Sequence, residues 1–246
     1  LRPSTGEIVW HYQFSPGDPY DYDGTNELVL ADLPMAGKDT KVLMQANRNG
    51  FFYVLDRSNG KLLSAQPFAK KINWASGIDM SSGRPIDTPM TATVRKSETM
   101  ADFIEVWPSA FGGKNWMPMS FDPVRRVAYF NTVNLGMKIK YVKQERPKQP
   151  TWYLGLELGG FVAPEDGQRG SLVAWDPVAG KKLWDMPSKS PYWAGVVSTA
   201  GGVLFTGAQT GEFMAFDAAS GKKLWQFQTG SGITGLPIVW ERGGRQ

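Results

Sequence analysis

Short apolar runs bounded by turn residues dominate this sequence. Residues 127–131 and 201–207, for example, have the composition of inner strands of a sheet. Few stretches show the 3.6-residue period of an amphipathic helix, because glycine and proline interrupt nearly every window. The pattern therefore predicts an all-β chain made of short strands.

Two segments of this pattern, residues 172–184 and 213–225, align without gaps. Each has an alternating strand, an aspartate, three turn residues, a glycine and a return strand that ends in tryptophan, which predicts a hairpin. Residues 4–10 repeat the spacing from glycine to tryptophan, and residues 53–63 and 77–86 are weaker copies. A repeated unit of about 40–50 residues is typical of propeller blades, so the chain would supply about four to five of them.

Residues 141–166 interrupt the repeat and are rich in proline, lysine and glycine. We expect a long loop or insertion there, with Trp152, Tyr153 and Leu154 partly packed. The chain has ten tryptophans, and those in the repeat are expected to be structural: Trp10, Trp184 and Trp225.

The amino-acid composition limits the kinds of chemical site that the chain can contain. The chain has no cysteine and one histidine, which excludes disulfides, thiolate catalysis and multi-histidine metal sites within it. The net charge is +4, but the basic residues are scattered, which disfavours nucleic-acid binding. No apolar run approaches the roughly 18 residues of a membrane span. Both ends look like cuts through a larger protein, so we expect any targeting segment to lie outside this chain.

The segment 16–27 is the richest in candidate chemistry, because Asp21 and Asp23 stand two residues apart. On an extended backbone both side chains point the same way, so they could serve one hard cation or one proton in transit. A solvated turn is the alternative, since aspartate, glycine, proline and asparagine are ordinary loop residues.

Three other short segments carry residues of interest. Arg48 follows an apolar strand, where its planar guanidinium could pair with a carboxylate. Asn115 and Trp116 lie in the glycine-containing segment 109–120, and Trp193 lies in segment 190–195. Each segment is unremarkable by itself.

Taken in order, these segments resemble the quinoprotein alcohol dehydrogenases, the pyrroloquinoline quinone (PQQ) enzymes of the methanol and ethanol dehydrogenase family. The repeat resembles that family's tryptophan-docking motif, Ala-x-Asp-x-x-x-Gly-x-x-x-Trp. The resemblance implies that residues 1–246 are the C-terminal portion of one eight-bladed β-propeller domain whose N-terminal blades are absent.

The resemblance also implies roles for individual residues. Asp21 matches the catalytic base and a metal ligand, and Asp23 matches the additional aspartate of lanthanide-dependent members. Arg48 matches an arginine that contacts both the catalytic aspartate and the quinone. Asn115 and Trp193 match PQQ-binding residues, and two further tryptophans are expected near the cavity: Trp116 and Trp74.

The implied reaction is the oxidation of a small primary alcohol to an aldehyde. Asp21 takes the hydroxyl proton, PQQ accepts hydride, and Ca²⁺ or a lanthanide ion, favoured by Asp23, acts as Lewis acid. Electrons then pass to cytochrome c, the expected location is the periplasm, and a homodimer is allowed. The remaining metal ligands would come from an upstream half, so we expect this chain alone to be inactive.

Two other interpretations stay open at this point. A non-catalytic propeller scaffold of the outer-membrane assembly type would need the repeats but not the ordered set Asp21, Arg48, Asn115 and Trp193. A sugar-oxidising quinoprotein would differ in the loops before Arg48 and around Asn115.

Overall fold

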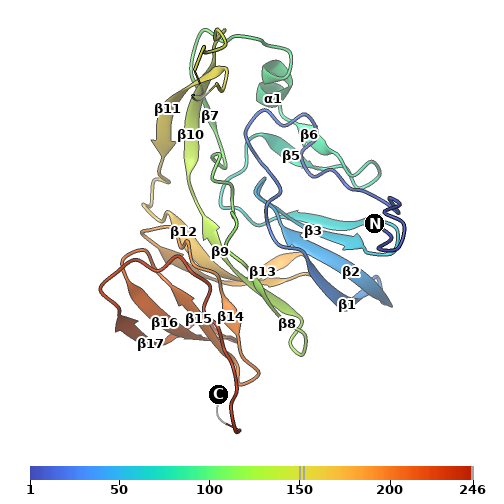
Figure 1. Ribbon diagram of the computed structural model, residues 1–246, viewed down its shortest axis with the longest axis vertical. Coiled ribbons are helices and arrows are strands. Elements are labelled where there is room, and N and C mark those ends of the chain that lie inside the picture. The colour runs from blue at the N-terminus through green and yellow to red at the C-terminus, as the bar shows by residue number, and fades with distance from the viewer. Residues whose placement is uncertain (150, 152, 245–246) are drawn as a thin grey trace.

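A computed structural model describes residues 1–149, 151 and 153–244. It confirms the all-β prediction, because the described residues form antiparallel sheets and one short helix, α1 (Pro89–Val94). Figure 1 shows the larger sheets following one another around the molecule in chain order.

The first blade is a four-stranded sheet in the order β1-β2-β3-β4, so each strand pairs with its neighbour in sequence. β3 and the second half of β2, residues 42–46, are buried because both of their faces carry mostly apolar side chains. The strand bounds are β1 (Val29–Met35), β2 (Lys38–Ala46), β3 (Phe51–Asp56) and β4 (Leu62–Pro67).

Two further four-stranded sheets form the second and third blades, in the orders β13-β12-β9-β8 and β14-β15-β16-β17. The Ser120 and Ser198 hydroxyls, 2.6 Å apart, join their first strands. The second blade consists of β8 (Ser120–Asp122), β9 (Val127–Val133), β12 (Gly170–Asp176) and β13 (Lys181–Ser188). The third consists of β14 (Val197–Ser198), β15 (Val203–Gly207), β16 (Glu212–Asp217) and β17 (Lys223–Gln228).

A three-stranded side sheet corrects part of the expectation of a long loop or insertion over residues 141–166, because residues 156–162 form a strand. β11 (Leu156–Val162) pairs with β10 (Gly136–Tyr141), which also pairs with β7 (Ile104–Val106). The side chains of Tyr153 and Leu154 are exposed rather than partly packed, and Trp152 lies outside the described residues. The edge of β10 accepts these residues as a strand despite their glycine content.

The hairpin glycines pack against the aromatic residues that the repeat predicts. A Cβ atom at Gly221 would lie 2.8 Å from the Trp184 ring, and one at Gly60 would lie 2.6 Å from the Trp10 ring. Both glycines have positive φ, so the turn and the close ring contact require glycine together. The indole Nε1 of Trp184 donates to the Ala218 carbonyl at 3.1 Å, which fixes the docked ring.

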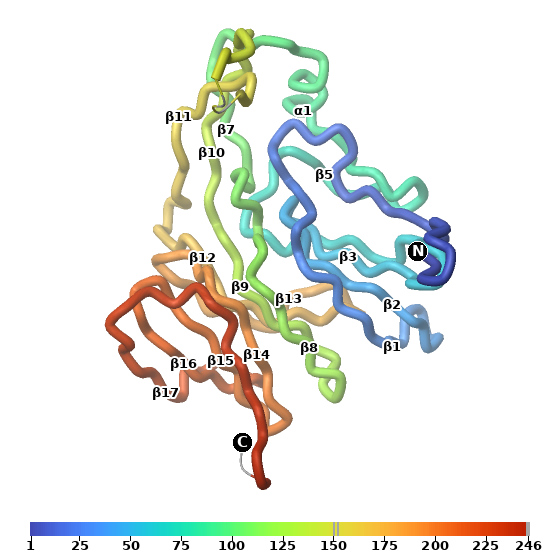
Figure 2. The backbone as a smooth tube through the Cα atoms, viewed as in Figure 1, coloured from blue at the N-terminus to red at the C-terminus, as the bar shows by residue number. Residues whose placement is uncertain are grey.

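The weaker copy at residues 77–86 forms a separate two-stranded hairpin of β5 (Ala75–Ile78) and β6 (Pro85–Asp87). Its Gly83 packs against Tyr12, whose hydroxyl donates to the Gly83 carbonyl at 2.7 Å. Figure 2 shows the N-terminal segment passing close to this hairpin and α1 before it enters β1. This path places residues 16–27 above the first blade.

Candidate functional site

The acidic loop, residues 16–27, alternates buried tyrosines with exposed aspartates. Tyr20 and Tyr22 are buried in the core, whereas the side chains of Asp21 and Asp23 are 65 % and 68 % exposed. Both carboxylates therefore lie on the solvent side of the loop, although the backbone at Asp21 is left-handed rather than extended.

Two hydroxyl contacts anchor the tyrosines. The Tyr22 hydroxyl donates to the Pro108 carbonyl at 2.6 Å, and the Tyr20 hydroxyl lies 3.0 Å from the Thr91 hydroxyl of α1. Because the residues on either side of Asp21 are fixed, its backbone is fixed too.

Asp18 organises the same loop and was not singled out from the sequence. Its carboxylate accepts hydrogen bonds from the backbone amides of Tyr20, at 2.9 Å, and Tyr22. Burial raises the pKa of Asp18, and the neighbouring carboxylates of Asp21 and Asp23 add to the increase. Asp21 itself has a φ of 66°, which is uncommon for a residue other than glycine.

Arg48 faces the two exposed carboxylates. Its Nη2 lies 3.3 Å from Asp21 Oδ2, and its Nη1 lies 4.0 Å from Asp23 Oδ2. Its Nε donates to the Ala110 carbonyl at 2.8 Å, and only 12 % of the side chain is exposed. The structure therefore brings Asp21, Asp23 and Arg48 together.

Buried amides on either side hold the backbone of Arg48. Asn47 accepts a hydrogen bond from the Asn49 amide at 3.0 Å, and Asn49 donates to the Tyr53 hydroxyl at 2.9 Å. The indole of Trp74 donates to the Asn49 carbonyl at 2.9 Å and is buried in the core. Trp74 thus supports the turn between β2 and β3 that carries Arg48.

The Asn115 loop, residues 109–120, packs directly on Arg48. The Gly113 amide donates to the Arg48 carbonyl at 2.9 Å. A Cβ atom at Gly112, where φ is 79°, would lie 2.3 Å from Arg48 Cγ and 2.6 Å from the Arg48 carbonyl oxygen. Glycine is required at position 112 because any side chain would push the loop away from Arg48.

Asn115 is buried, and its amide is partly used within its own loop. Its Nδ2 donates to the Phe111 carbonyl at 2.9 Å, and its Oδ1 accepts from the Trp116 amide at 2.8 Å. The second N–H of the amide takes no part in these two contacts.

An aromatic group joins Trp193 to the Asn115 loop. Phe111 stacks on Phe161 of β11 with 4.5 Å between ring centroids and meets Trp193 edge-on at 5.4 Å. Trp116 is 48 % exposed next to Asn115. Trp193 therefore contacts the Asn115 loop through Phe111, and Trp116 is part of the same loop. Phe111 and Phe161 are not predicted as site residues from the sequence.

The donor set determines which ligands the site fits. Within the described residues, no group of three or more His, Cys, Asp or Glu side chains could hold a metal ion. Asp21 and Asp23 supply carboxylate oxygens, the ligands of hard cations, but two carboxylates are a partial set. Arg48, an amide N–H and aromatic surface suit a planar anionic group.

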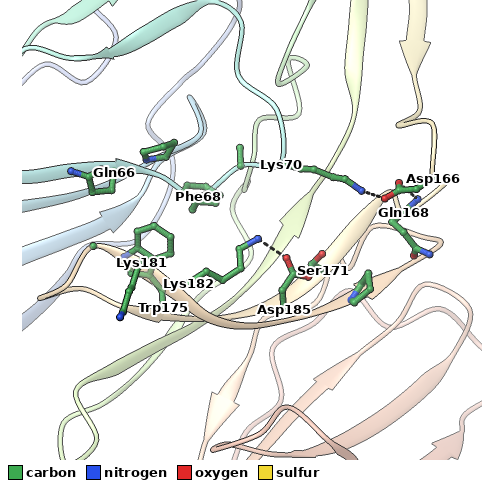
Figure 3. A pocket seen from close by; sticks show the side chains of 14 residues that line it. Gln66, Phe68, Lys70, Asp166, Gln168, Ser171, Trp175, Lys181, Lys182 and Asp185 are labelled. Atoms are coloured by element: carbon green, nitrogen blue, oxygen red, sulfur yellow. Dashed lines mark hydrogen bonds and ion pairs between the residues drawn. The ribbon is translucent and has the colours of Figure 1, made fainter.

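A cavity of about 730 Å³ lies elsewhere, between the first and second blades (Figure 3). Ser64 stands in the tryptophan position of that junction, and the atoms nearest to a Cβ atom at Gly180 belong to Gln66 and Ser64. Two ion pairs line the opening, Lys70–Asp166 and Lys182–Asp185. The residues that line this cavity include none of the site residues.

Among the described residues, no helix has both the length and the apolar character needed to cross a membrane.

Two family models match separate parts of the chain. Residues 1–66 match the β-propeller domain of glucose, ethanol and alcohol dehydrogenases. Residues 168–242 match the outer membrane protein assembly factor BamB. The first match contains Asp21, Asp23 and Arg48, and the second contains the two strongest docking repeats.

Alignments to similar proteins cover the whole chain or nearly all of it. Quinoprotein alcohol dehydrogenase PedE of Pseudomonas putida is 44 % identical over 100 % of the chain and 39 % of its own length. The 1-butanol dehydrogenase (cytochrome c) of Thauera butanivorans is 39 % identical over 100 % of the chain and 36 % of its own length. A europium-containing methanol dehydrogenase structure gives a TM-score of 0.84 at 36 % identity, covering 99 % of this chain and 42 % of the other.

The chain spans about two-fifths of the length of these relatives. The similarity confirms that its sheets are part of a β-propeller.

Proposed function

The chain belongs to the family of quinoprotein alcohol dehydrogenases, and on that premise we propose that the complete protein oxidises a small primary alcohol to an aldehyde. The observation that carries this proposal is the joint placement of Asp21, Asp23 and Arg48 beside the Asn115 loop. Residues 1–246 would be the C-terminal portion of one propeller domain.

Asp21 would act as the general base. Its carboxylate is exposed to an incoming hydroxyl group, and its backbone is held by the anchored tyrosines on both sides. It would take the proton of the alcohol while Arg48 stabilises the negative charge that develops next to it. Arg48 is suited to this because Ala110 and the buried amides fix its position before substrate binds.

PQQ, when bound, supplies the hydride acceptor, and the metal ion supplies Lewis-acid assistance. Arg48, Asn115, Trp193 and Trp116 would hold the cofactor through a guanidinium group, an amide N–H and aromatic surface. Asp21 and Asp23 would bind the metal ion, Ca²⁺ or a lanthanide. The second aspartate favours the lanthanide, because a trivalent ion requires more anionic oxygen.

Cytochrome c is the proposed electron acceptor, and the periplasm is the proposed location. The relative from Thauera butanivorans, whose name includes cytochrome c, supports the acceptor. A homodimer is part of the same proposal.

The match of residues 168–242 to an assembly factor is the specific observation in favour of a scaffold. Only Trp193 of the proposed site lies in that region, and the match coincides with the docking hairpins that both kinds of propeller need. The full-length similarity to alcohol dehydrogenases favours the enzyme. A sugar-oxidising quinoprotein is the remaining alternative.

The metal assignment is tested on the complete protein with PQQ, a primary alcohol and an artificial electron acceptor. Wild-type protein should be more active with La³⁺ than with Ca²⁺, and Asp23→Ala should lose the La³⁺-dependent activity. Asp39→Ala removes another exposed aspartate and is the control. Equal La³⁺ activity in Asp23→Ala and wild type would contradict the role of Asp23, and faster turnover of glucose than of ethanol would favour the sugar enzyme.

A further inference from the structure

Lys114, next to Asn115, is the most completely buried charged side chain of the site region. Its side chain is 0 % exposed, and its Nζ lies 2.8 Å from Glu27 Oε2. The same ammonium group donates to the Asn115 carbonyl at 3.2 Å. Burial lowers the pKa of Lys114, and the Glu27 carboxylate opposes that decrease.

Glu27 uses its second oxygen to hold the other end of the Asn115 loop. Its Oε1 accepts a hydrogen bond from the Met119 amide at 2.7 Å. Lys114 and Met119 are therefore both tied to one carboxylate at the end of the acidic loop.

A neighbouring amide makes a parallel connection between the two loops. Asn26 Nδ2 donates to the Asn115 carbonyl at 2.8 Å, so that carbonyl accepts from both Asn26 and Lys114. Among the described residues, the buried Oδ1 of Asn26 has no hydrogen-bond partner. The side chain thus makes the contact to Asn115 while leaving its own buried oxygen unpaired, which is unfavourable.

Stability alone is a weak reason for such an arrangement. A buried ion pair often contributes no more to stability than well-packed apolar side chains of similar volume. Its charge-assisted contacts, however, require particular positions of both charged groups. Here the pair spans the two loops that carry Asp21 and Asn115, on either side of Arg48.

We propose that Lys114 and Glu27 are positioning residues that hold the Asn115 loop in register with the acidic loop, so that Asn115 and Arg48 are set for cofactor binding. This inference rests on the proposed function, because the cofactor is the PQQ of that function. Neither residue contacts the reacting atoms in this role; each acts through Asn115 and the backbone beside Arg48.

The test is titration of the PQQ-free complete protein with PQQ, followed by absorbance, together with urea unfolding of each variant. The variants are Lys114→Met, the milder Glu27→Gln, and the double variant Lys114→Met/Glu27→Met. Lys182→Met, which removes an exposed lysine paired with Asp185, is the matched control.

We expect Lys114→Met and Glu27→Gln to weaken PQQ binding by roughly 10–100-fold, the range for supporting residues around a site. The double variant should regain stability because it leaves no unpaired buried charge, yet its affinity should remain at least roughly tenfold below wild type. The control should bind PQQ as wild type does.

Wild-type affinity in the folded double variant would overturn the inference, because the pair would then be only structural. If the methionine variants do not fold, Glu27→Gln decides, with PQQ titrated under conditions where urea unfolding shows this variant to be fully folded: unchanged affinity overturns the positioning role, and weakened affinity supports it. The wild-type titration tests the proposed function separately. Absence of PQQ uptake there overturns both, whereas uptake that is equal in all variants overturns only the positioning role.

Discussion

The acidic loop with Arg48 and the docked hairpins of residues 172–184 and 213–225 hold their side chains by different means. In the hairpins, a turn aspartate, a glycine with positive φ and a tryptophan act within a few residues of one another or across one blade junction. In the acidic loop, each functional side chain is fixed by partners far away in sequence.

The two regions also differ in what their side chains can do. The hairpins bury aromatic surface and complete a repeating scaffold, so a change there should act mainly on stability. The acidic loop leaves two carboxylates exposed beside a nearly buried guanidinium group, so a change there should act mainly on chemistry.

Asp21→Asn gives the largest expected separation between the two regions. Loss of the general base should lower kcat by roughly 10²–10⁴-fold, while stability stays near wild type because the side chain is exposed. The measurement is steady-state oxidation of ethanol by the loaded complete protein. Asp32→Asn, an equally exposed aspartate that pairs with Arg57, is the control. Turnover near that of wild type would remove Asp21 from the mechanism.

Arg48→Lys should have the next largest effect. Lysine keeps the charge but cannot contact Ala110, Asp21 and Asp23 from one planar group, so kcat should fall by roughly 100-fold. Lys41→Arg, on an exposed part of β2, should leave kcat unchanged. An undiminished kcat in Arg48→Lys would show that charge alone suffices.

Trp184→Ala tests whether the docked hairpins act mainly on stability. Loss of the ring that packs on Gly221 and donates to Ala218 should lower the free energy of unfolding by about 2 kcal/mol. Urea denaturation measures this change, and PQQ affinity should remain at the wild-type value. A large loss of affinity with little loss of stability would reverse the assignment of the two regions.

Asp18 should have the smallest effect, a change in how stability depends on pH. Because its pKa is raised in the folded protein, its proton contributes stability below the ordinary aspartate pKa, and this contribution is lost as pH rises through the folded pKa. In acid, wild-type stability should therefore fall with rising pH more than that of Asp18→Asn. Urea unfolding at a series of pH values measures the slopes, and identical slopes would contradict the raised pKa.

The same contrast determines what could be predicted from sequence. The repeat predicts its hairpins because their turn chemistry and tryptophan spacing are local, and the structure confirms them at Gly60 and Gly221. β11 was missed because its strand forms by pairing with β10 rather than by its own composition. Near the site, the sequence singles out Asp21, Asp23 and Arg48, but not the distant carbonyls of Pro108 and Ala110 that hold the acidic loop and Arg48 in place. Lys114 carries no sequence signal of burial, because only the tertiary fold brings Glu27 to it.

We propose that Asp21 and Asp23, beside Arg48, form the metal-binding edge of the cofactor site. A crystal structure of the complete protein grown with PQQ and Eu³⁺, with anomalous data, would locate the metal ion. We expect an anomalous peak within roughly 2.3–2.6 Å of oxygens from both Asp21 and Asp23, as for large hard cations. A peak bound by other side chains, with these two carboxylates still turned only toward Arg48, would contradict it.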